Sequence, residues 1–261
     1  MQIFKNNFVL LLYSLYSDIN RAIISRGFIV GLVGMVLMIA FASTSQIVEI
    51  IRTTEPLEEG FYVHFMYNAL HSYAFTLALP ILVTLPFTTA FVDDIKSGFI
   101  KQYLLRSTRL RYILGKLVSI LISGGLLVLI GILISFVVAI IFISPREEVF
   151  TGDSVNRIDV IEKAFMISLS GMFWSLVGFA FSSFTMNRYM AYASPFILYY
   201  VLIILHERYF PTFYIMYPRE WIFPENDWRL GNLGIVILLA MLILVVSLCF
   251  ALFAKRRLKN V

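Results

Sequence analysis

The chain has 261 residues, of which 60% are hydrophobic and only 14% are charged, and its mean hydropathy is +0.86. Soluble domains carry about 25% charged residues, so this composition excludes a soluble protein and predicts an all-α integral membrane protein. The length provides for about six spans of roughly 20 residues in one membrane domain over 1–261, and the net charge of +5 does not indicate nucleic-acid binding.

Residues 3–26 predict an amphipathic helix at the membrane interface. Its apolar and polar side chains fall on different helical faces: Phe4, Phe8, Leu11, Leu15, Ile19 and Ile23 on one, and Asn7, Ser14, Asp18, Arg21 and Ser25 on another. A cleaved signal peptide is the competing interpretation. Against it, the apolar core over 8–13 is short and no small-x-small cleavage site follows.

The first two spans are predicted over 27–43 and 69–92. The first begins with the pair Gly27 and Gly31, whose spacing lets helix backbones approach closely. The second contains Pro80 and Pro86, which we expect to kink it because proline removes a backbone donor and crowds the preceding turn.

The loop over 93–116 carries six basic residues against two acidic ones. Such an excess of Lys and Arg in a short loop is typical of the cytoplasmic side of a membrane protein. Within it, Phe99, Ile100, Tyr103 and Leu104 share a helical face between charged flanks. The loop therefore predicts a short cytoplasmic helix with an apolar face.

Four further spans follow, predicted over 117–143, 164–184, 190–205 and 234–254. The third span carries Gly131 and Ser135 at small-residue spacing. The fourth carries a row of small residues suited to close helix contact: Ser168, Gly171, Ser175 and Gly178.

Residues 206–232 are rich in aromatic side chains and lie between the fifth and sixth spans. Aromatic residues gather at membrane interfaces, so this segment is predicted to lie at the outer surface. The side chains concerned are Tyr209, Phe210, Phe213, Tyr214, Tyr217, Trp221, Phe223 and Trp228. They predict either an external interfacial element or an aromatic belt that anchors the last span.

Charges on the two sides support this topology. The N-terminal segment, the 93–116 loop, Arg188 and the tail after 254 together hold 14 basic and 3 acidic residues, while the other loops hold 7 basic and 13 acidic. The positive-inside rule then predicts a multi-pass cell-membrane protein with both termini in the cytoplasm and six spans.

The loop over 93–116 resembles that between the second and third spans of type-2 ATP-binding cassette (ABC) exporter permeases. The resemblance rests on Asp94, Ser97-Gly98, Leu104-Leu105, Ser107-Thr108-Arg109 and the ending 113–116; a turn proline is absent and Phe99 replaces a usual Thr. It implies a coupling helix that docks on an ATPase through Asp94, Gly98, Phe99, Ile100, Lys101, Tyr103, Leu104 and Arg106.

The same resemblance implies the rest of the assembly. Two ABC ATPase subunits would bind ATP and Mg²⁺, a second permease chain would complete the path, and this chain would bind no cofactor. The helix over 3–26 would lie along the cytoplasmic leaflet. Short external helices within 206–232 would cap the path with Tyr209, Phe213, Tyr217, Trp221 and Trp228 as gate residues.

The function expected is outward movement of an amphipathic or hydrophobic substrate, such as a peptide, lipid or drug. Two alternatives stay open: an immunity or peptide-binding membrane protein without transport, and an intramembrane enzyme. No catalytic or metal-binding residue is predicted, because Leu110 and Leu117 break a P-loop pattern around Lys116, and Phe210 stands where a second zinc-binding His would follow His206. No predicted span contains Asp, Glu, Lys or Arg, which disfavours an ion-coupled carrier.

Overall fold

The computed structural model describes residues 2–52, 57–148 and 157–259, which are predominantly helical. In chain order the helices are α1 (Gln2–Ile23), α2 (Arg26–Ala42), α3 (Thr44–Arg52), α4 (Phe61–His71), α5 (Tyr73–Leu82), α6 (Ala90–Lys96), α7 (Phe99–Arg106), α8 (Arg109–Ile143), α9 (Arg157–Thr185), α10 (Arg188–Ile204) and α11 (Asn232–Arg257). Shorter elements are the 3-10 turns η1 (Ser144–Arg146) and η3 (Tyr214–Met216), the π-helical turn η2 (Leu205–Tyr209), and the strands β1 (Leu57–Glu58) and β2 (Glu147–Glu148).

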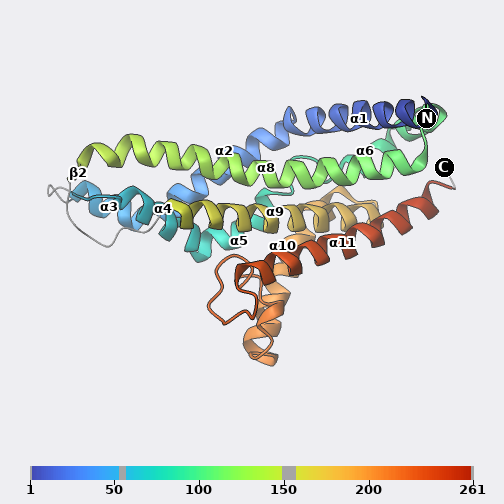
Figure 1. Cartoon of the computed structure of the whole chain (residues 1–261). Helices are drawn as coiled ribbons and strands as arrows, with labels where there is room; N and C mark the ends of the chain where they lie inside the picture. The colour runs from blue at the N-terminus through green and yellow to red at the C-terminus, as the bar shows by residue number, and fades with distance from the viewer. Residues whose placement is uncertain (1, 53–56, 149–156, 260–261) are drawn as a thin grey trace.

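The helices form an elongated bundle (Figure 1). Helices α8, α9 and α11 run along its length, α1 and α2 pack against α8, and both chain ends lie at the same end of the bundle. Helix α10 packs against α9 and α5, and its far end with η2 projects from the side of the bundle.

The lengths and apolar character of the helices confirm an all-α membrane protein. Within the described residues, four helical stretches are long and apolar enough to cross a membrane: Arg109–Arg146, Val160–Thr185, Arg188–Tyr209 and Asn232–Arg257. A fifth candidate is the pair Tyr13–Ile23 and Arg26–Ala42, which is bent by 53° at its break. These correspond to the predicted first, third, fourth, fifth and sixth spans.

The predicted second span, over 69–92, is not one continuous helix. Helix α4 ends at His71, Ser72 caps the start of α5 by accepting from the Phe75 amide, and α5 ends at Leu82 two residues after Pro80. Residues 83–89 form turns around Pro86, and α6 begins only at Ala90. The predicted proline kink is therefore a full break, because Pro86 has no backbone N–H to continue a helix.

Small residues bring the helices together where the sequence predicted close packing. A Cβ on Gly27 would lie 2.1 Å from the Leu85 carbonyl oxygen, and one on Gly124 would lie 2.4 Å from the Ser175 hydroxyl oxygen. The hydroxyls of Ser168 and Ser175 donate across the same α8–α9 contact, to the carbonyls of Gly125 and Ile120. Glycine and serine thus supply close approach and hydrogen bonds within the chain itself.

At the end away from the termini, a short parallel β-bridge joins two loops. Leu57 and Glu58 pair with Glu147 and Glu148. The Glu147 carboxylate also accepts from the backbone amides of Gly60 (3.3 Å) and Tyr62 (3.0 Å) at the start of α4. A carboxylate at a helix N-terminus satisfies otherwise unpaired amides, so the end of α8 is fastened to α4.

The contact at Gly27 gives a test of this packing. Gly27→Ala would push a methyl group into the backbone at Leu85, so we expect a loss of about 1–3 kcal/mol, typical of overpacking. Gly34→Ala is the matched control, because its Cβ would meet only the flexible end of the Leu82 side chain. Thermal unfolding of both variants in the same detergent measures the difference, and equal melting temperatures would contradict the packing described here.

Candidate functional site

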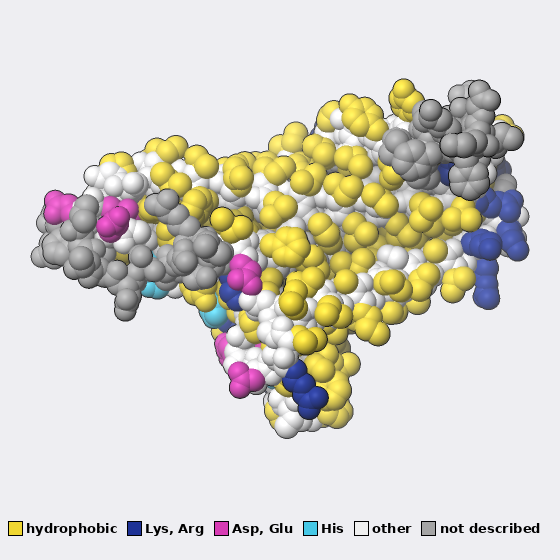
Figure 2. Space-filling model, in the orientation of Figure 1, with side chains coloured by type: hydrophobic (Ala, Val, Ile, Leu, Met, Phe, Trp, Pro, Cys, Tyr) yellow, Lys and Arg dark blue, Asp and Glu magenta, His cyan; other side chains and the backbone are white. Residues whose placement is uncertain are grey.

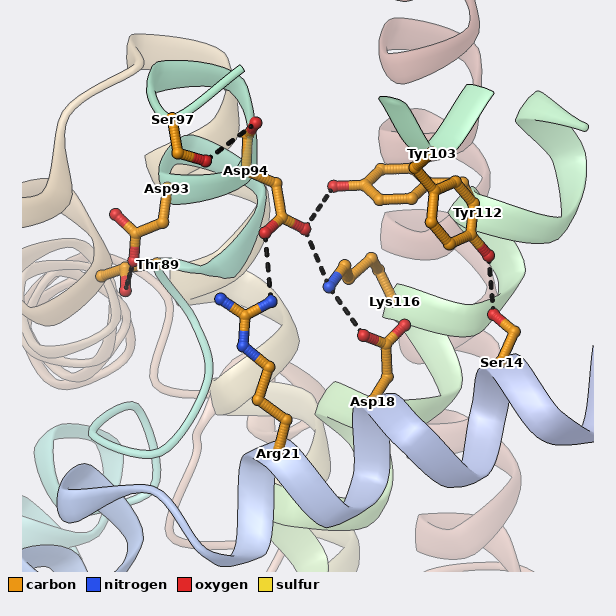
Figure 3. A network of polar contacts seen from close by, with 10 residues as sticks. All are labelled: Ser14, Asp18, Arg21, Thr89, Asp93, Asp94, Ser97, Tyr103, Tyr112 and Lys116. Carbon is orange, nitrogen blue, oxygen red and sulfur yellow. Dashed lines mark hydrogen bonds and ion pairs between the residues drawn. The ribbon is translucent and has the colours of Figure 1, made fainter. Parts of the chain in front are cut away.

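A buried ion pair joins α6 to α8 at the end of the bundle where both termini lie (Figure 3). Asp94 of α6 and Lys116 of α8 are each only 1% exposed, and the Lys116 Nζ lies 2.9 Å from an Asp94 carboxylate oxygen. Burying either charge alone costs several kcal/mol, so this pair constrains how the two helices meet.

Helix α1 contributes the other half of the network. The Lys116 ammonium also donates to Asp18 at 2.8 Å, and the Arg21 guanidinium donates to Asp94 at 3.2 Å. The Tyr112 hydroxyl donates to Asp94 at 2.9 Å. Two acidic and two basic groups thus balance in charge, and Asp94 accepts from three donors on two helices.

Apolar side chains enclose the network. The Lys116 Nζ lies 4.8 Å from the centre of the Phe87 ring and 5.5 Å from that of Tyr112, both favourable for a cation. The surrounding apolar cluster includes Phe91, Phe179 and Phe250, each fully buried. Such surroundings exclude water from Asp94 and Lys116, each 1% exposed, so these two charges depend on their partners for solvation, while the Arg21 side chain is 54% exposed.

Further polar contacts extend the network to α7 and α10. The hydroxyls of Ser14 on α1 and Tyr103 on α7 lie 2.7 Å apart. Asp93 accepts from the Thr89 hydroxyl at 2.9 Å and from the Arg188 guanidinium at the start of α10. Five helices, α1, α6, α7, α8 and α10, are therefore connected at one end of the bundle.

Helix α7 is the predicted coupling helix, and it forms at the predicted place. Gly98 precedes it with a φ of 75°, a left-handed conformation that glycine adopts without strain. Ile100 is 1% exposed and belongs to the buried apolar cluster, and Tyr103 and Leu104 are half-buried against it.

The predicted docking residues are therefore partly buried and partly exposed. Asp94 and Ile100 are buried inside the protein and cannot contact a partner in this structure. On α7, Lys101 and Leu105 are exposed on the outer face, Leu105 at 87%, and Phe99, beside Tyr103, is 42% exposed. Leu105 was not predicted as a docking residue, although it follows Leu104 directly in the sequence; the side chain of Arg106 lies outside the described part.

Helix α1 forms over the predicted stretch, and its place along the cytoplasmic leaflet stays a prediction. The structure adds contacts that the sequence did not indicate. Helix α1 packs lengthwise on α8, and Ser14, Asp18 and Arg21 of its polar face contact α7, α8 and α6 (Figure 3). The buried Lys116 and Asp94 explain this orientation, because they need partners of opposite charge.

The network itself was not predicted. Its signal in the sequence was the position of the two charges: Asp94 follows the predicted second span by two residues, and Lys116 directly precedes the predicted third span. Opposite charges at the same end of two neighbouring spans can pair. Sequence spacing alone could not show that α1 supplies the other two charges from about 70 to 100 residues away.

The aromatic segment after α10 forms turns, with η3 as its one short helical element after η2, in place of the short helices expected. Of the predicted gate residues, Tyr209 and Phe213 are 68% and 53% exposed, and Tyr217 and Trp228 are half-buried. Trp221 is 2% exposed and stacks on Trp174 with ring centres 5.9 Å apart. Trp221 is thus a core residue that holds the segment against α9.

A buried carboxylate gives this segment its shape. Glu220 is 2% exposed and accepts from the amides of Glu225 and Asn226, the Asn226 side chain and the Trp228 indole. These bonds close a tight loop, which explains why turns replace helices. Nearby, burial raises the pKa of the Tyr217 hydroxyl, while the Arg219 guanidinium acts in the opposite direction.

Histidines of this region make aromatic contacts. His71 packs on Phe223 with ring centres 4.1 Å apart, and His206 stacks on Tyr217 at 4.3 Å. Within the described residues, no three His, Cys, Asp or Glu side chains gather as metal ligands would.

The charged surface differs between the two ends of the bundle. On the face shown in Figure 2, Lys and Arg gather at the end that carries the chain termini, acidic side chains lie at the opposite end, and side chains of both signs lie near the projecting part. This separation agrees with the asymmetry counted from the sequence. The network and α7 belong to the basic end.

Comparison with known proteins gives no relative: no family model, no curated protein and no solved structure matches the chain.

The charge network can be tested by removing its members one at a time. Lys116→Met would leave Asp94 and Asp18 without their shared cation, and we expect a loss of about 3–5 kcal/mol in the free energy of unfolding. Asp94→Asn combined with Lys116→Met should cost less than the sum of the two single changes, because the groups interact directly. Chemical denaturation in detergent micelles measures these differences.

The control for this experiment is Lys101→Met, which alters an exposed lysine of the same loop. It should change stability by no more than about 0.5 kcal/mol. Additive effects of the two buried changes would contradict the ion pair.

Proposed function

We propose that this chain is the membrane-spanning permease subunit of an ATP-driven exporter of the ABC type, with α7 as the coupling helix. One observation supports the proposal most. Helix α7 is held on one face by Ile100 and Tyr103, while Leu105 is exposed on the opposite side and Phe99, at the edge of the held face, is 42% exposed. A short helix with this arrangement suits docking of an amphipathic surface on a partner.

The internal contacts of α7 suggest how movement would pass to the membrane helices. A partner that displaces α7 would pull on α1 through the Tyr103–Ser14 hydrogen bond and on the apolar cluster through Ile100. Through Lys116, Asp18 and Asp94, α1, α6 and α8 would then move together. Packed, charge-paired helices transmit displacement because they have few ways to deform.

In this proposal ATP and Mg²⁺ bind to two separate ATPase subunits, and a second permease chain, identical or related, completes the path. Six spans remain part of the proposal, with α4, α5 and α6 together as a broken second span. The substrate is amphipathic or hydrophobic and leaves near the segment over 206–232, which lies on the outer side. This orientation is supported by the basic end of the bundle, which should face the cytoplasm.

The orientation can be measured by labelling cysteines in intact cells. With the native Cys249 changed to Ser, Lys101→Cys on α7 should be protected from a membrane-impermeant maleimide, and Glu59→Cys in the loop before α4 should react. Both native residues are exposed, so accessibility within the fold does not limit the reaction. Reaction at Lys101→Cys in sealed cells would reverse the proposed topology, and lysed cells provide the control.

Docking can be tested with Leu105→Asp. Leu105 is 87% exposed, so the charge should leave the fold intact. Burial of a leucine side chain contributes roughly 1.5–3 kcal/mol, so we expect the variant to lose most of its co-purifying ATPase and its stimulated ATP hydrolysis in reconstituted vesicles. Leu104→Asp is a less selective choice, because Leu104 packs against the protein's own core.

The matched control is Leu110→Asp, the same change at an exposed leucine in the first turn of α8, outside α7. It should retain the ATPase. If Leu105→Asp also retains both the ATPase and the stimulation at equal membrane insertion, α7 is not a coupling helix. A peptide-binding membrane protein without transport would give that result.

A further inference from the structure

An apolar groove of about 360 Å³ lies at the end of the bundle opposite the charge network. Helices α2 and α3 form one wall and the last turns of α8 form the other. Its walls include Val36, Ala40, Ile47, Val138 and Phe142. The volume falls within the range of about 300–1,000 Å³ that is typical of ligand sites.

The sequence of α3 explains why the groove has an apolar wall. This nine-residue helix is strongly amphipathic, and its isoleucines, Ile47, Ile50 and Ile51, line the groove. Glu49 does not line the groove. Helix α3 therefore turns its apolar side toward α8, yet Ile51 remains 73% exposed.

The polar groups of the groove are few and differ in role. Ser135 donates its hydroxyl to the Gly131 carbonyl at 2.9 Å within α8, so it is already used by its own helix. Arg146, just beyond the end of α8, donates to the Ile50 carbonyl at 2.8 Å. That bond holds a guanidinium where α3 and α8 end, at the end of an otherwise apolar channel.

We propose that this groove holds an acyl chain of one phospholipid, with the lipid phosphate bound by Arg146. The walls match a hydrocarbon chain, and a guanidinium is suited to a phosphate because its five N–H donors form a planar fork. The same Arg146 guanidinium would donate to the Ile50 carbonyl and to the lipid phosphate. A phospholipid has an apolar acyl chain that matches the apolar walls and an anionic phosphate that matches Arg146 at the end of the groove.

The setting also favours a lipid. Phe142 and Ile51 beside the groove are each 73% exposed, and an apolar surface at the end of a membrane-spanning helix contacts lipid directly. The proposal depends on the membrane location of the bundle and not on transport. Its outcome is therefore independent of whether α7 binds an ATPase.

The test uses the full chain in mild detergent and a phosphatidylglycerol probe with a photoreactive diazirine in its acyl chain. We expect cross-links in the peptides that contain α3 and residues 135–146, identified by mass spectrometry. Arg146→Gln should weaken the concentration dependence of this labelling by about tenfold, as expected for loss of a charge-assisted hydrogen bond. A diacylglycerol probe, which lacks phosphate, should label the site as weakly in wild type as phosphatidylglycerol does in Arg146→Gln.

Blocking the groove provides the second arm. Ala40 lines it and is exposed, so Ala40→Phe should occupy the channel without disturbing the core and should abolish labelling of these peptides. Ala193→Phe places the same side chain at an exposed alanine of α10 and should leave labelling unchanged. Melting temperatures of the variants establish that each is folded.

Several outcomes would overturn the proposal. Equal labelling by the phosphatidylglycerol and diacylglycerol probes would exclude the phosphate contact. Labelling that persists in Ala40→Phe would exclude the groove. A dimer of this chain that Ala40→Phe dissociates, with no lipid cross-link in wild type, would assign the face to a second copy.

Discussion

Two charges that cannot be solvated by water determine how one end of this protein is built. Asp94 and Lys116 are both 1% exposed among aromatic side chains, and each needs the other to offset the cost of its burial. Because Asp94 also accepts from Tyr112 and Arg21, the position of α1 relative to α6 and α8 is fixed by the same requirement. The amphipathic N-terminal helix is thus bound to the bundle through its polar face.

The apolar interior is divided into two clusters, and the break over 83–89 lies near their boundary. One cluster surrounds the network and receives Ile100 from α7. The other lies toward the opposite end and receives Trp221 and Phe223 from the aromatic segment. Each loop segment with a predicted function is therefore fastened by a residue that packs into the cluster nearest to it.

Much of the architecture could be predicted because hydrophobic runs and proline positions are local signals. The runs over 117–143 and 234–254 gave α8 and α11, and the apolar spacing from Phe99 to Leu104 gave α7. The direction in which side chains point was not predictable in the same way. Ile100 and Leu105 are similar in hydrophobicity, yet Ile100 is buried in a cluster built from several helices and Leu105 is 87% exposed.

The hydrogen bonds of two buried or partly buried carboxylates could not be predicted from the sequence either. Glu220 appeared to be one acidic residue of an outer loop, yet it is buried and organises that loop through bonds to residues five to eight positions away. Glu147 likewise appeared to be a surface charge, although it caps a helix that begins some 85 residues earlier. The balance of charges in the loops predicts the side of the membrane on which such residues lie, whereas the packing of the fold determines their hydrogen-bond partners.

Helix α8 has 35 residues and no proline, so at a rise of 1.5 Å per residue it is a rod about 52 Å long, longer than the roughly 30 Å hydrocarbon layer. Because the helix is continuous, a tilt at one end moves the other end by a larger distance. Lys116 lies near one end, and Glu147, which follows the other end, is bonded to the start of α4. A tilt of only about 5° around one end would carry the other through on the order of 4–5 Å, because a continuous helix of this length converts rotation into displacement. A small tilt imposed at the basic end would thus displace the opposite end without any change in the helix itself.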